Sequence, residues 1–261
     1  MYALPIVKKL ILVLAFLSSW SHSALAEQFN VLLITKTVGW HHPAIHEGVA
    51  GMRHLAKKHF FQLTWEENVD RVITDASLSK YDALVFLLTT GDILSDEQQA
   101  VVERFIRSGK GFVGVHSAAD TEYEWEWYTR LVGHMFHIHP VIQTAHLRVL
   151  DGKFPGLERM PKRLWWTDEW YEYGPAKTKG LEYLLAVDER SYDPKVEWKA
   201  QKKSGKGMGG FHPIAWYHPF DGGRAFYTGL GHMPSSYSDP LFLAHLYGGL
   251  HWAATGKGQP R

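Results

Sequence analysis

The stretch "GKGFVGVHSAAD" at Gly109–Asp120 joins a buried strand to a tight turn. Within it, "GFVGV" at Gly111–Val115 is a short apolar run, which is typical of a strand covered on both faces of a parallel sheet. Small or polar residues follow at once, and the first of them is His116. Many α/β enzymes hold a nucleophile at the turn that follows such a strand, so His116 is a candidate functional residue whose ring should face a pocket rather than the core.

The segments before this stretch alternate between strand and helix patterns. Apolar runs predict strands, and apolar residues at helical spacing predict helices. A capping box of Ser95 and Gln98 predicts the start of the helix that closes at Gly109. The predicted elements are strands at Phe29–Thr35, Phe60–Glu66 and Asp82–Leu88, a helix opened by Pro43 over residues 43–59, and the capped helix over 95–109. This alternation predicts a three-layer α/β fold with a mainly parallel central sheet.

The second half of the chain is less regular. Its apolar segments predict partly antiparallel strands over 141–150, 163–171, 181–187, 213–220 and 224–230, and a final helix over 239–256. Asp193–Gly210 is rich in lysine and glycine, so we expect it to be a mobile surface loop. Because no linker separates the two halves, residues 27–261 are expected to form a single domain.

Residues 1–26 have the pattern of a secretory signal peptide. Lys8 and Lys9 precede the apolar run Leu10–Leu17, and Ala24–Ala26 fits the small-x-small cleavage rule. This run is well short of the ~20 residues that span a bilayer. We therefore expect a periplasmic or secreted protein that is free of the membrane once the signal is cleaved near Glu27.

The composition excludes several classes of function and favours another. The chain has no cysteine, which rules out disulfides, thiolate catalysis, cysteine-ligated zinc and a lipoprotein anchor. Its net charge of +1 is spread along the chain, so we expect no nucleic-acid partner. The 16 histidines, 11 tryptophans and 12 tyrosines suit polar ligands with apolar faces, such as sugars. Composition leaves open whether the chain forms a homo-oligomer.

Polar residues gather in predicted loops and at predicted strand ends. Ligands bind beyond the carboxyl ends of parallel strands, so His116, Asp120, His134, His137 and His232 should share one pocket with Trp40 and His41 at its rim, and the rings of His116 and His232 should lie within roughly 12 Å of each other. The candidates are Trp40, His41, His42, His116, Asp120, His134, His137, Asp168, Glu169 and His232. At most one of Asp168 and Glu169 should enter the pocket, because successive strand residues face opposite ways.

Two further features leave alternatives open. His134 and His137 are three residues apart, which would place both on one face of a helix and permit joint binding of a metal, although solvent-facing rings after a helix would look the same. Alternating tryptophans and tyrosines surround Asp168 and Glu169, among them Trp170 and Tyr171. These aromatic residues fit either a sheet core or a wall on which a sugar stacks.

Five ordered segments resemble the ThuA-like (trehalose utilisation) family. They are "GVHSAAD", "GHMFHIHP", "DEWY", "HPIAWYHPFDGGRAFYTGLGH" and "GGLHWAATG", and the resemblance runs from about Phe29 to Gly256. The family is similar in fold to class I glutamine amidotransferases, a flavodoxin-like architecture in which a cysteine occupies the turn matched here by His116. The resemblance therefore implies a protein that is not a functional amidotransferase, because imidazole would give a labile acyl adduct.

The resemblance also implies a protein of carbohydrate catabolism that acts on 3-keto-glycosides by proton abstraction and elimination. Its catalytic residues would be His116, Asp120, Glu169 and His232, and its substrate-binding residues Trp40, His41, His42, Trp170 and Tyr171. One divalent metal ion, with His134 and His137 as ligands, is compatible with such a site. The alternatives are a non-catalytic sugar-binding protein and a hydrolase that uses metal-activated water.

Overall fold

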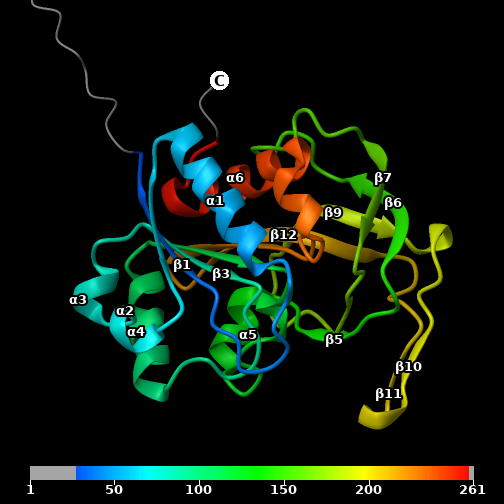
Figure 1. Ribbon diagram of the computed structural model, residues 1–261, viewed down its shortest axis with the longest axis horizontal. Helices are drawn as coiled ribbons and strands as arrows, with labels where there is room; N and C mark the ends of the chain where they lie inside the picture. The colour runs from blue at the N-terminus through cyan, green and yellow to red at the C-terminus, as the bar shows by residue number, and fades with distance from the viewer. Residues whose placement is uncertain (1–27, 259–261) are drawn as a thin grey trace, which may run out of the picture.

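A twisted nine-stranded sheet forms the centre of the molecule in the computed structural model, which describes residues 28–258 (Figure 1). Its strands are β1 (Asn30–Ile34), β2 (Gln62–Glu66), β3 (Ala83–Leu87), β4 (Gly111–Val115), β6 (Gln143–Val149), β7 (Arg163–Asp168), β9 (Glu182–Asp188), β12 (His212–Phe220) and β13 (Gly223–Thr228). Their order is β2-β1-β3-β4-β13-β12-β9-β6-β7. The strands from β2 to β13 are parallel, and from β13 to β7 each neighbour is antiparallel. The predicted α/β fold, with its parallel centre and antiparallel C-terminal half, is confirmed.

Helices cover both faces of the parallel part of the sheet. The helices α1 (Ile45–His59) and α6 (Pro240–Thr255) lie on one face, and α2 (Val69–Val72), α3 (Asp75–Leu78), α4 (Asp96–Arg107) and α5 (Glu126–Val132) lie on the other (Figure 1). In β1, Val31 and Leu33 pack toward α1 and α6, whereas Leu32 and Ile34 pack toward the opposite layer. Both faces of the strand are buried, which explains why its sequence is apolar throughout.

Local signals place the helix ends close to their predicted positions. The Ser95 hydroxyl accepts a hydrogen bond from the Gln98 backbone, and the Gln98 side chain accepts one from the Ser95 backbone, so the predicted capping box is present. Asp239 caps the last helix, where its side chain accepts the backbone N–H groups of Leu241 and Phe242. The first helix begins at Ile45, two residues after the predicted Pro43.

The stretch expected to be a mobile loop instead contains a β-hairpin. Its strands are β10 (Val196–Trp198) and β11 (Lys203–Gly205), joined by the 3₁₀ turn η3 (Lys199–Gln201), and it projects from the sheet at the lower right of Figure 1. The prediction failed because distant carboxylates fix the returning chain. Glu172 accepts the backbone N–H groups of residues 206 and 207, and Glu189 accepts those of residues 208 and 209.

Residues 28–258 include no helix that is both long and apolar enough to cross a membrane. The predicted signal peptide, residues 1–26, lies outside the described residues. Within them, one continuous sheet separates the two hydrophobic clusters.

A buried histidine of α6 should make stability depend on pH. Burial lowers the pKa of His245 to about 3, whereas an unfolded histidine titrates near 6.5. The unfolded chain therefore binds the proton first, and stability should fall as the pH drops below about 6.5, by up to about 1.4 kcal/mol per pH unit from this one ring. Urea unfolding of wild type and His245→Leu at pH 7, 6 and 5 checks this, because the variant should show the shallower decline. Identical declines would contradict it.

Candidate functional site

His116 sits at a strained turn directly after the central strand β4. It opens the 3₁₀ turn η1 (His116–Asp120) with a φ of +52°, in the left-handed region that residues other than glycine rarely adopt. Such strain persists where the surroundings enforce it, and it clusters at functional sites. Its Nδ1–H donates to the carbonyl oxygen of Gly229 at 2.9 Å, which leaves Nε2 as the atom with a free lone pair.

Four loops bring their polar residues to the same edge of the sheet. The pairing pattern makes β1, β4, β13 and β7 point the same way, and their following loops carry His42, His116, His232 and Glu169 respectively. Three strands separate β7 from β13 in the sheet order, yet Asp168 at the end of β7 hydrogen bonds to the loop after β13. The site therefore draws on both the parallel and the antiparallel halves of the sheet.

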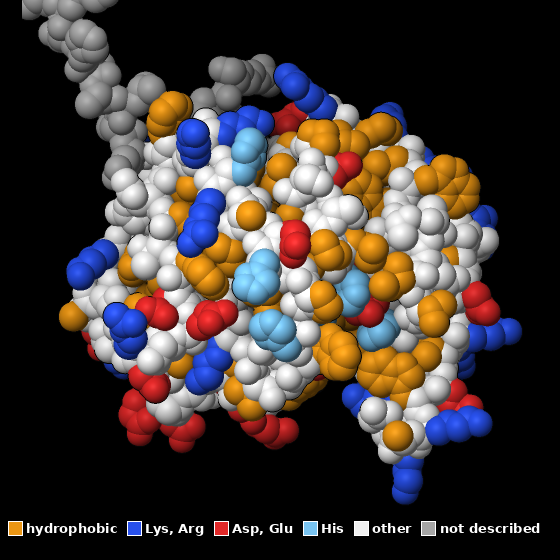
Figure 2. All heavy atoms as spheres, in the orientation of Figure 1, with side chains coloured by type: hydrophobic (Ala, Val, Ile, Leu, Met, Phe, Trp, Pro, Cys, Tyr) orange, Lys and Arg blue, Asp and Glu red, His pale blue; other side chains and the backbone are white. Residues whose placement is uncertain are grey.

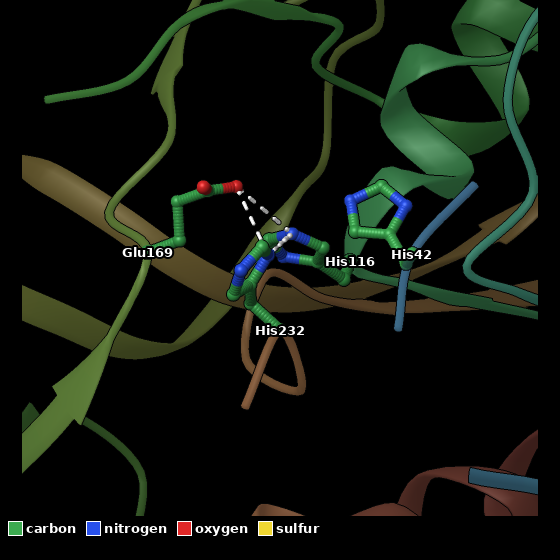
Figure 3. A group of neighbouring side chains, drawn as sticks. All are labelled: His42, His116, Glu169 and His232. Carbon is green, nitrogen blue, oxygen red and sulfur yellow. Dashed lines mark hydrogen bonds and ion pairs between the residues drawn. The ribbon is translucent and has the colours of Figure 1, made fainter. Parts of the chain in front are cut away.

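Three potential ligand atoms form a nearly equilateral triangle (Figure 3). His116 Nε2 lies 3.3 Å from Glu169 Oε2 and 3.2 Å from His232 Nδ1, and the latter two atoms are 3.2 Å apart. With His42, all four ligand atoms lie within 4.8 Å of one another. Ligands held at about 2.1 Å around a tetrahedral Zn²⁺ are about 3.4 Å apart. The cluster therefore has the spacing and donor types to hold a divalent cation.

The charge states of the cluster suit metal binding. For Glu169, burial opposes ionisation, but hydrogen bonds from His116 and His232 and the charge of His116 and His139 outweigh burial and hold its pKa well below the usual range. Burial, followed by the neighbouring histidines, lowers the pKa of His42, so its ring is neutral. Burial also acts to lower the pKa of His232, but the neighbouring Glu169 carboxylate outweighs it and raises that pKa. A cation would displace any proton on His232 and take over its pairing with Glu169.

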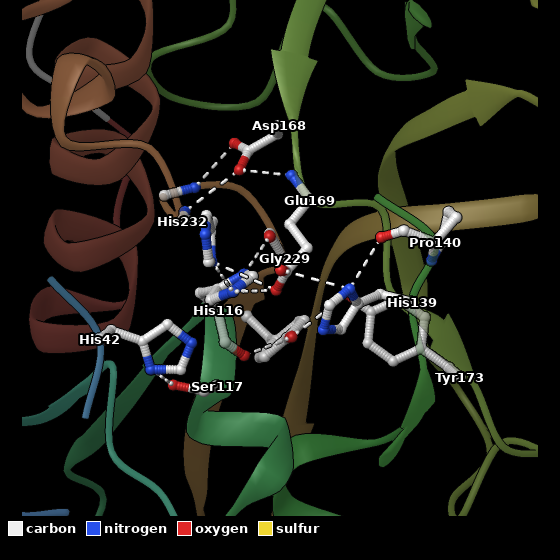
Figure 4. Close-up of polar contacts among 12 residues, drawn as sticks. His42, His116, Ser117, His139, Pro140, Asp168, Glu169, Tyr173, Gly229 and His232 are labelled. Atoms are coloured by element: carbon white, nitrogen blue, oxygen red, sulfur yellow. Dashed lines mark hydrogen bonds and ion pairs between the residues drawn. The ribbon is translucent and has the colours of Figure 1, made fainter. Parts of the chain in front are cut away.

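Asp168 holds two of the candidate ligands in place. Its fully buried carboxylate accepts the backbone N–H groups of Glu169 and Gly231 at 3.0 Å and of His232 at 3.1 Å (Figure 4). Gly231 has a φ of +109°, and a Cβ there would meet the Tyr237 hydroxyl at 2.8 Å. As predicted, only Glu169 of the acidic pair faces the cluster. Asp168 instead fixes the turn that carries His232.

An aromatic pocket of about 700 Å³ opens above the cluster. Figure 2 shows histidine side chains gathered at the middle of this face, with hydrophobic side chains beside them. The ring of Tyr171 lies 4.2 Å from the ring of His116 and 4.2 Å from that of Phe136. The lining residues are Trp40, His42, Asp120, Phe136, His139, Glu169, Tyr171, Trp198, Lys199, Ala200, Gln201 and His232.

The sequence profile of the ThuA family, described as trehalose utilisation, matches residues 30–253. The chain belongs to the ThuA family. No curated protein matches it. Its family points to carbohydrate utilisation.

Solved structures share the fold of this ThuA chain. A protein described as ThuA-like from Bacteroides uniformis superposes with a TM-score of 0.74 at 19% identity, over 90% of this chain and 96% of that one. Another from Parabacteroides merdae gives a TM-score of 0.66 at 17% identity, over 89% and 92%. A β-galactosidase from Bacillus circulans sp. alkalophilus gives 0.53 at 13% identity, over 84% of this chain but 30% of that enzyme.

Most of the predicted site residues come together in the ThuA chain. His116 and His232 have ring centroids 5.1 Å apart, well inside the expected limit. The residues that line the pocket as predicted are Trp40, His42, Asp120, Glu169, Tyr171 and His232. The prediction that the His116 ring faces the pocket is wrong, because that ring is fully buried against Tyr171. Asp120 accepts a hydrogen bond from Tyr123, and burial raises the pKa of its carboxyl group.

The expected metal pair His134 and His137 is not on one helix face. Helix α5 ends at Val132, and Gly133, with a φ of +98°, turns the chain, so His137 falls in the short strand β5 (Phe136–Ile138). His134 Nδ1–H donates to a backbone carbonyl at 2.9 Å, and Nε2 lies 3.0 Å from a tyrosine hydroxyl. His137 Nε2–H donates to the carbonyl of residue 204 at 3.3 Å. Neither ring belongs to the ligand cluster.

Two expected substrate-binding residues also lie outside the pocket lining. His41 is exposed, and its Nδ1 is 3.2 Å from the hydroxyl of Thr37. Trp170 is buried in the core, where its indole N–H donates to the carbonyl of Gln143 at 2.9 Å. Both interpretations of the aromatic residues around Glu169 therefore apply, because Trp170 packs in the core and Tyr171 faces the pocket.

His139 is a pocket residue that the sequence reasoning missed. Its Nδ1–H donates to the carbonyl of Pro140 at 2.8 Å and lies 3.3 Å from Glu169 Oε1, so Nε2 keeps its lone pair. Figure 4 shows the ring on the opposite side of Glu169 from His116 and His232. The sequence feature that could have indicated His139 is its position directly before Pro140, because a proline there ends the strand and the chain turns.

Proposed function

We propose that this protein is a metal-dependent enzyme that cleaves 3-keto-glycosides. The observation that carries the proposal is the triangle of His116, His232 and Glu169 at the base of an aromatic pocket. The family description supports a carbohydrate as substrate. A pocket of about 700 Å³ exceeds the needs of one sugar ring, so it has room for a glycoside with its leaving group.

The residues that would hold the cation are His116, His232 and Glu169, with His42 as a fourth donor. Imidazole nitrogens with one carboxylate favour Zn²⁺ or a neighbouring first-row metal over Mg²⁺ or Ca²⁺. The backbone acceptor at Nδ1 of His116 is the type of outer partner that fixes a ligand tautomer. A bound cation supplies Lewis acidity for a ketone oxygen.

Two pocket groups outside the ligand set are suited to move protons. His139 presents Nε2 as an acceptor, and burial lowers its pKa, which keeps the ring neutral. It would take the proton from C2, next to the C3 ketone, and leave the electron pair as an enolate. The C1–O bond then breaks as the C1–C2 double bond forms. Asp120, whose pKa burial raises, would give the departing oxygen its proton.

Metal analysis and turnover test this proposal together. We expect purified protein to hold close to one equivalent of a first-row metal, and to release the leaving group from 3-keto-trehalose or a 3-keto-glucoside in a chelator-sensitive way. Activity should return when Zn²⁺ is added back. Metal with no turnover would instead favour a hydrolase of another substrate. Binding of sugar without metal or turnover would favour the sugar-binding alternative.

We also propose that the protein is exported. Residues 1–26 carry the charged, apolar and small-residue segments of a signal peptide. Fractionation followed by N-terminal sequencing should find mature protein that begins near Glu27 outside the cytoplasm. A cytoplasmic protein that retains residue 1 would contradict this.

A further inference from the structure

The hairpin of β10 and β11 supplies one wall of the pocket. Trp198 at the end of β10 and all three residues of η3 line it, and so does Trp40 in the loop after β1. Both indole rings therefore face the same cavity, and Trp198 is half-buried. The family profile and the ligand cluster assign no role to this wall.

The ring of His139 contacts both the ligand cluster and Trp198. Its Nδ1 is 3.3 Å from Glu169 Oε1, and its centroid is 4.8 Å from that of Trp198. Phe136 supports the indole from the side, with ring centroids 6.1 Å apart. A pyranose that reacts at the cluster would therefore place its glycosidic neighbour beside Trp198.

The hairpin is held firmly enough to present that indole in a fixed position. Glu172 accepts the backbone N–H groups of Lys206 at 2.9 Å and Gly207 at 2.7 Å. Lys203 Nζ donates to the carbonyl of His137 at 3.3 Å, which ties β11 to β5. A stacking platform that is already ordered loses little entropy when it binds a ring.

Two polar side chains of η3 remain available to a ligand. Lys199 and Gln201 line the pocket, and neither side chain hydrogen bonds to another residue within 28–258. Sugar hydroxyls are the partners that an ammonium and an amide beside an aromatic face would take. The wall thus combines an apolar face with donors at its edge.

We propose that Trp198, with Lys199 and Gln201, forms the subsite for the leaving-group sugar and makes the enzyme prefer disaccharides. The inference rests on the proposed function, in which the neighbouring ring is cleaved at the metal cluster. Trp198 would stack on the ring that departs, and Lys199 and Gln201 would bond its hydroxyls. The substrate class is a 3-keto-glucosyl sugar rather than a simple alkyl 3-keto-glucoside.

The test compares two substrates with the same reacting ring and anomeric configuration. On the zinc-loaded protein, Trp198→Ala should lower kcat/KM for 3-keto-trehalose by roughly tenfold and change that for methyl 3-keto-α-glucoside by less than about twofold. Trp198→Phe should recover much of the loss because it keeps an aromatic face. Trp165→Ala is the matched control, since Trp165 is exposed on β7 and lies outside the pocket lining.

Equal losses on both substrates, or no loss on either, would overturn the subsite. If wild type turns over neither substrate, the proposed reaction is wrong. The subsite is then tested on its own by measuring binding affinities. Calorimetry with trehalose and methyl α-glucoside should then show tighter binding of the disaccharide, and Trp198→Ala should remove the difference. Equal affinities in wild type would reject the subsite as well.

Discussion

His116→Ala is expected to empty the proposed metal site and to slow cleavage of a 3-keto-glycoside by ~10²–10⁴-fold, because a Lewis-acid cation supplies several kcal/mol of transition-state stabilisation. The substitution removes one corner of the triangle with Glu169 and His232, whose sides are 3.2–3.3 Å. The two remaining atoms cannot enclose a cation in the same way, and the carboxylate loses a partner. Metal content by mass spectrometry and single-substrate kinetics measure both effects.

The control for His116→Ala is His146→Ala. His146 lies in β6, as predicted, and its ring stacks on Trp165 with centroids 3.5 Å apart, away from the pocket. This variant should keep its metal and its rate. If His116→Ala keeps the metal content and the rate of wild type, His116 is not part of the site.

The stability cost of His116→Ala should exceed that of a typical surface substitution. The ring is fully buried, contrary to the expectation of a ring open to the pocket, because Tyr171 packs against it. Its Nδ1–H donates a hydrogen bond to the Gly229 carbonyl. Loss of that hydrogen bond leaves a buried carbonyl unsatisfied, which costs about 1–3 kcal/mol. Thermal unfolding of the metal-free proteins separates this cost from the loss of metal.

The parallel half of the fold was predictable because its signals are local. Buried strands such as Gly111–Val115 are apolar throughout, and the capping box at Ser95 marks a helix start without reference to distant residues. The hairpin at 196–205 was not predictable for the opposite reason. Its order depends on Glu172 and Glu189, which lie 34 and 19 residues from the N–H groups they accept.

The candidate site was predictable where residues directly follow strands that point the same way. His116 and His232 met that condition, and they converge. The prediction that His134 and His137 share a helix face was wrong, because Gly133 ends the helix just before them. His139 lines the pocket because β5, just before it, pairs with β8 (Glu172–Tyr173). Trp198 lines the pocket because it belongs to the β10–β11 hairpin. Residue spacing in the sequence predicts neither of these arrangements.

Asp168→Asn is expected to destabilise the protein and to weaken metal binding. The carboxylate accepts three backbone N–H groups, from Glu169, Gly231 and His232, in a site without solvent access. An asparagine offers one acceptor oxygen and turns an NH₂ donor toward these donors. We expect a loss of about 2–4 kcal/mol in unfolding free energy, since hydrogen bonds to charged groups are worth about 1.5–3 kcal/mol each.

The metal affinity of Asp168→Asn shows whether Asp168 positions the ligands or only stabilises the fold. Outer partners of metal ligands typically contribute ~10–100-fold in affinity, so zinc should bind that much more weakly at a temperature where the variant is folded. Asp188→Asn is the matched control, because Asp188 also ends a strand, is nearly buried and accepts the backbone N–H of Arg190. It should cost stability and leave zinc affinity unchanged. Equal zinc affinity in Asp168→Asn and wild type would reduce Asp168 to a structural residue, because the positions of Glu169 and His232 would then not depend on its charge.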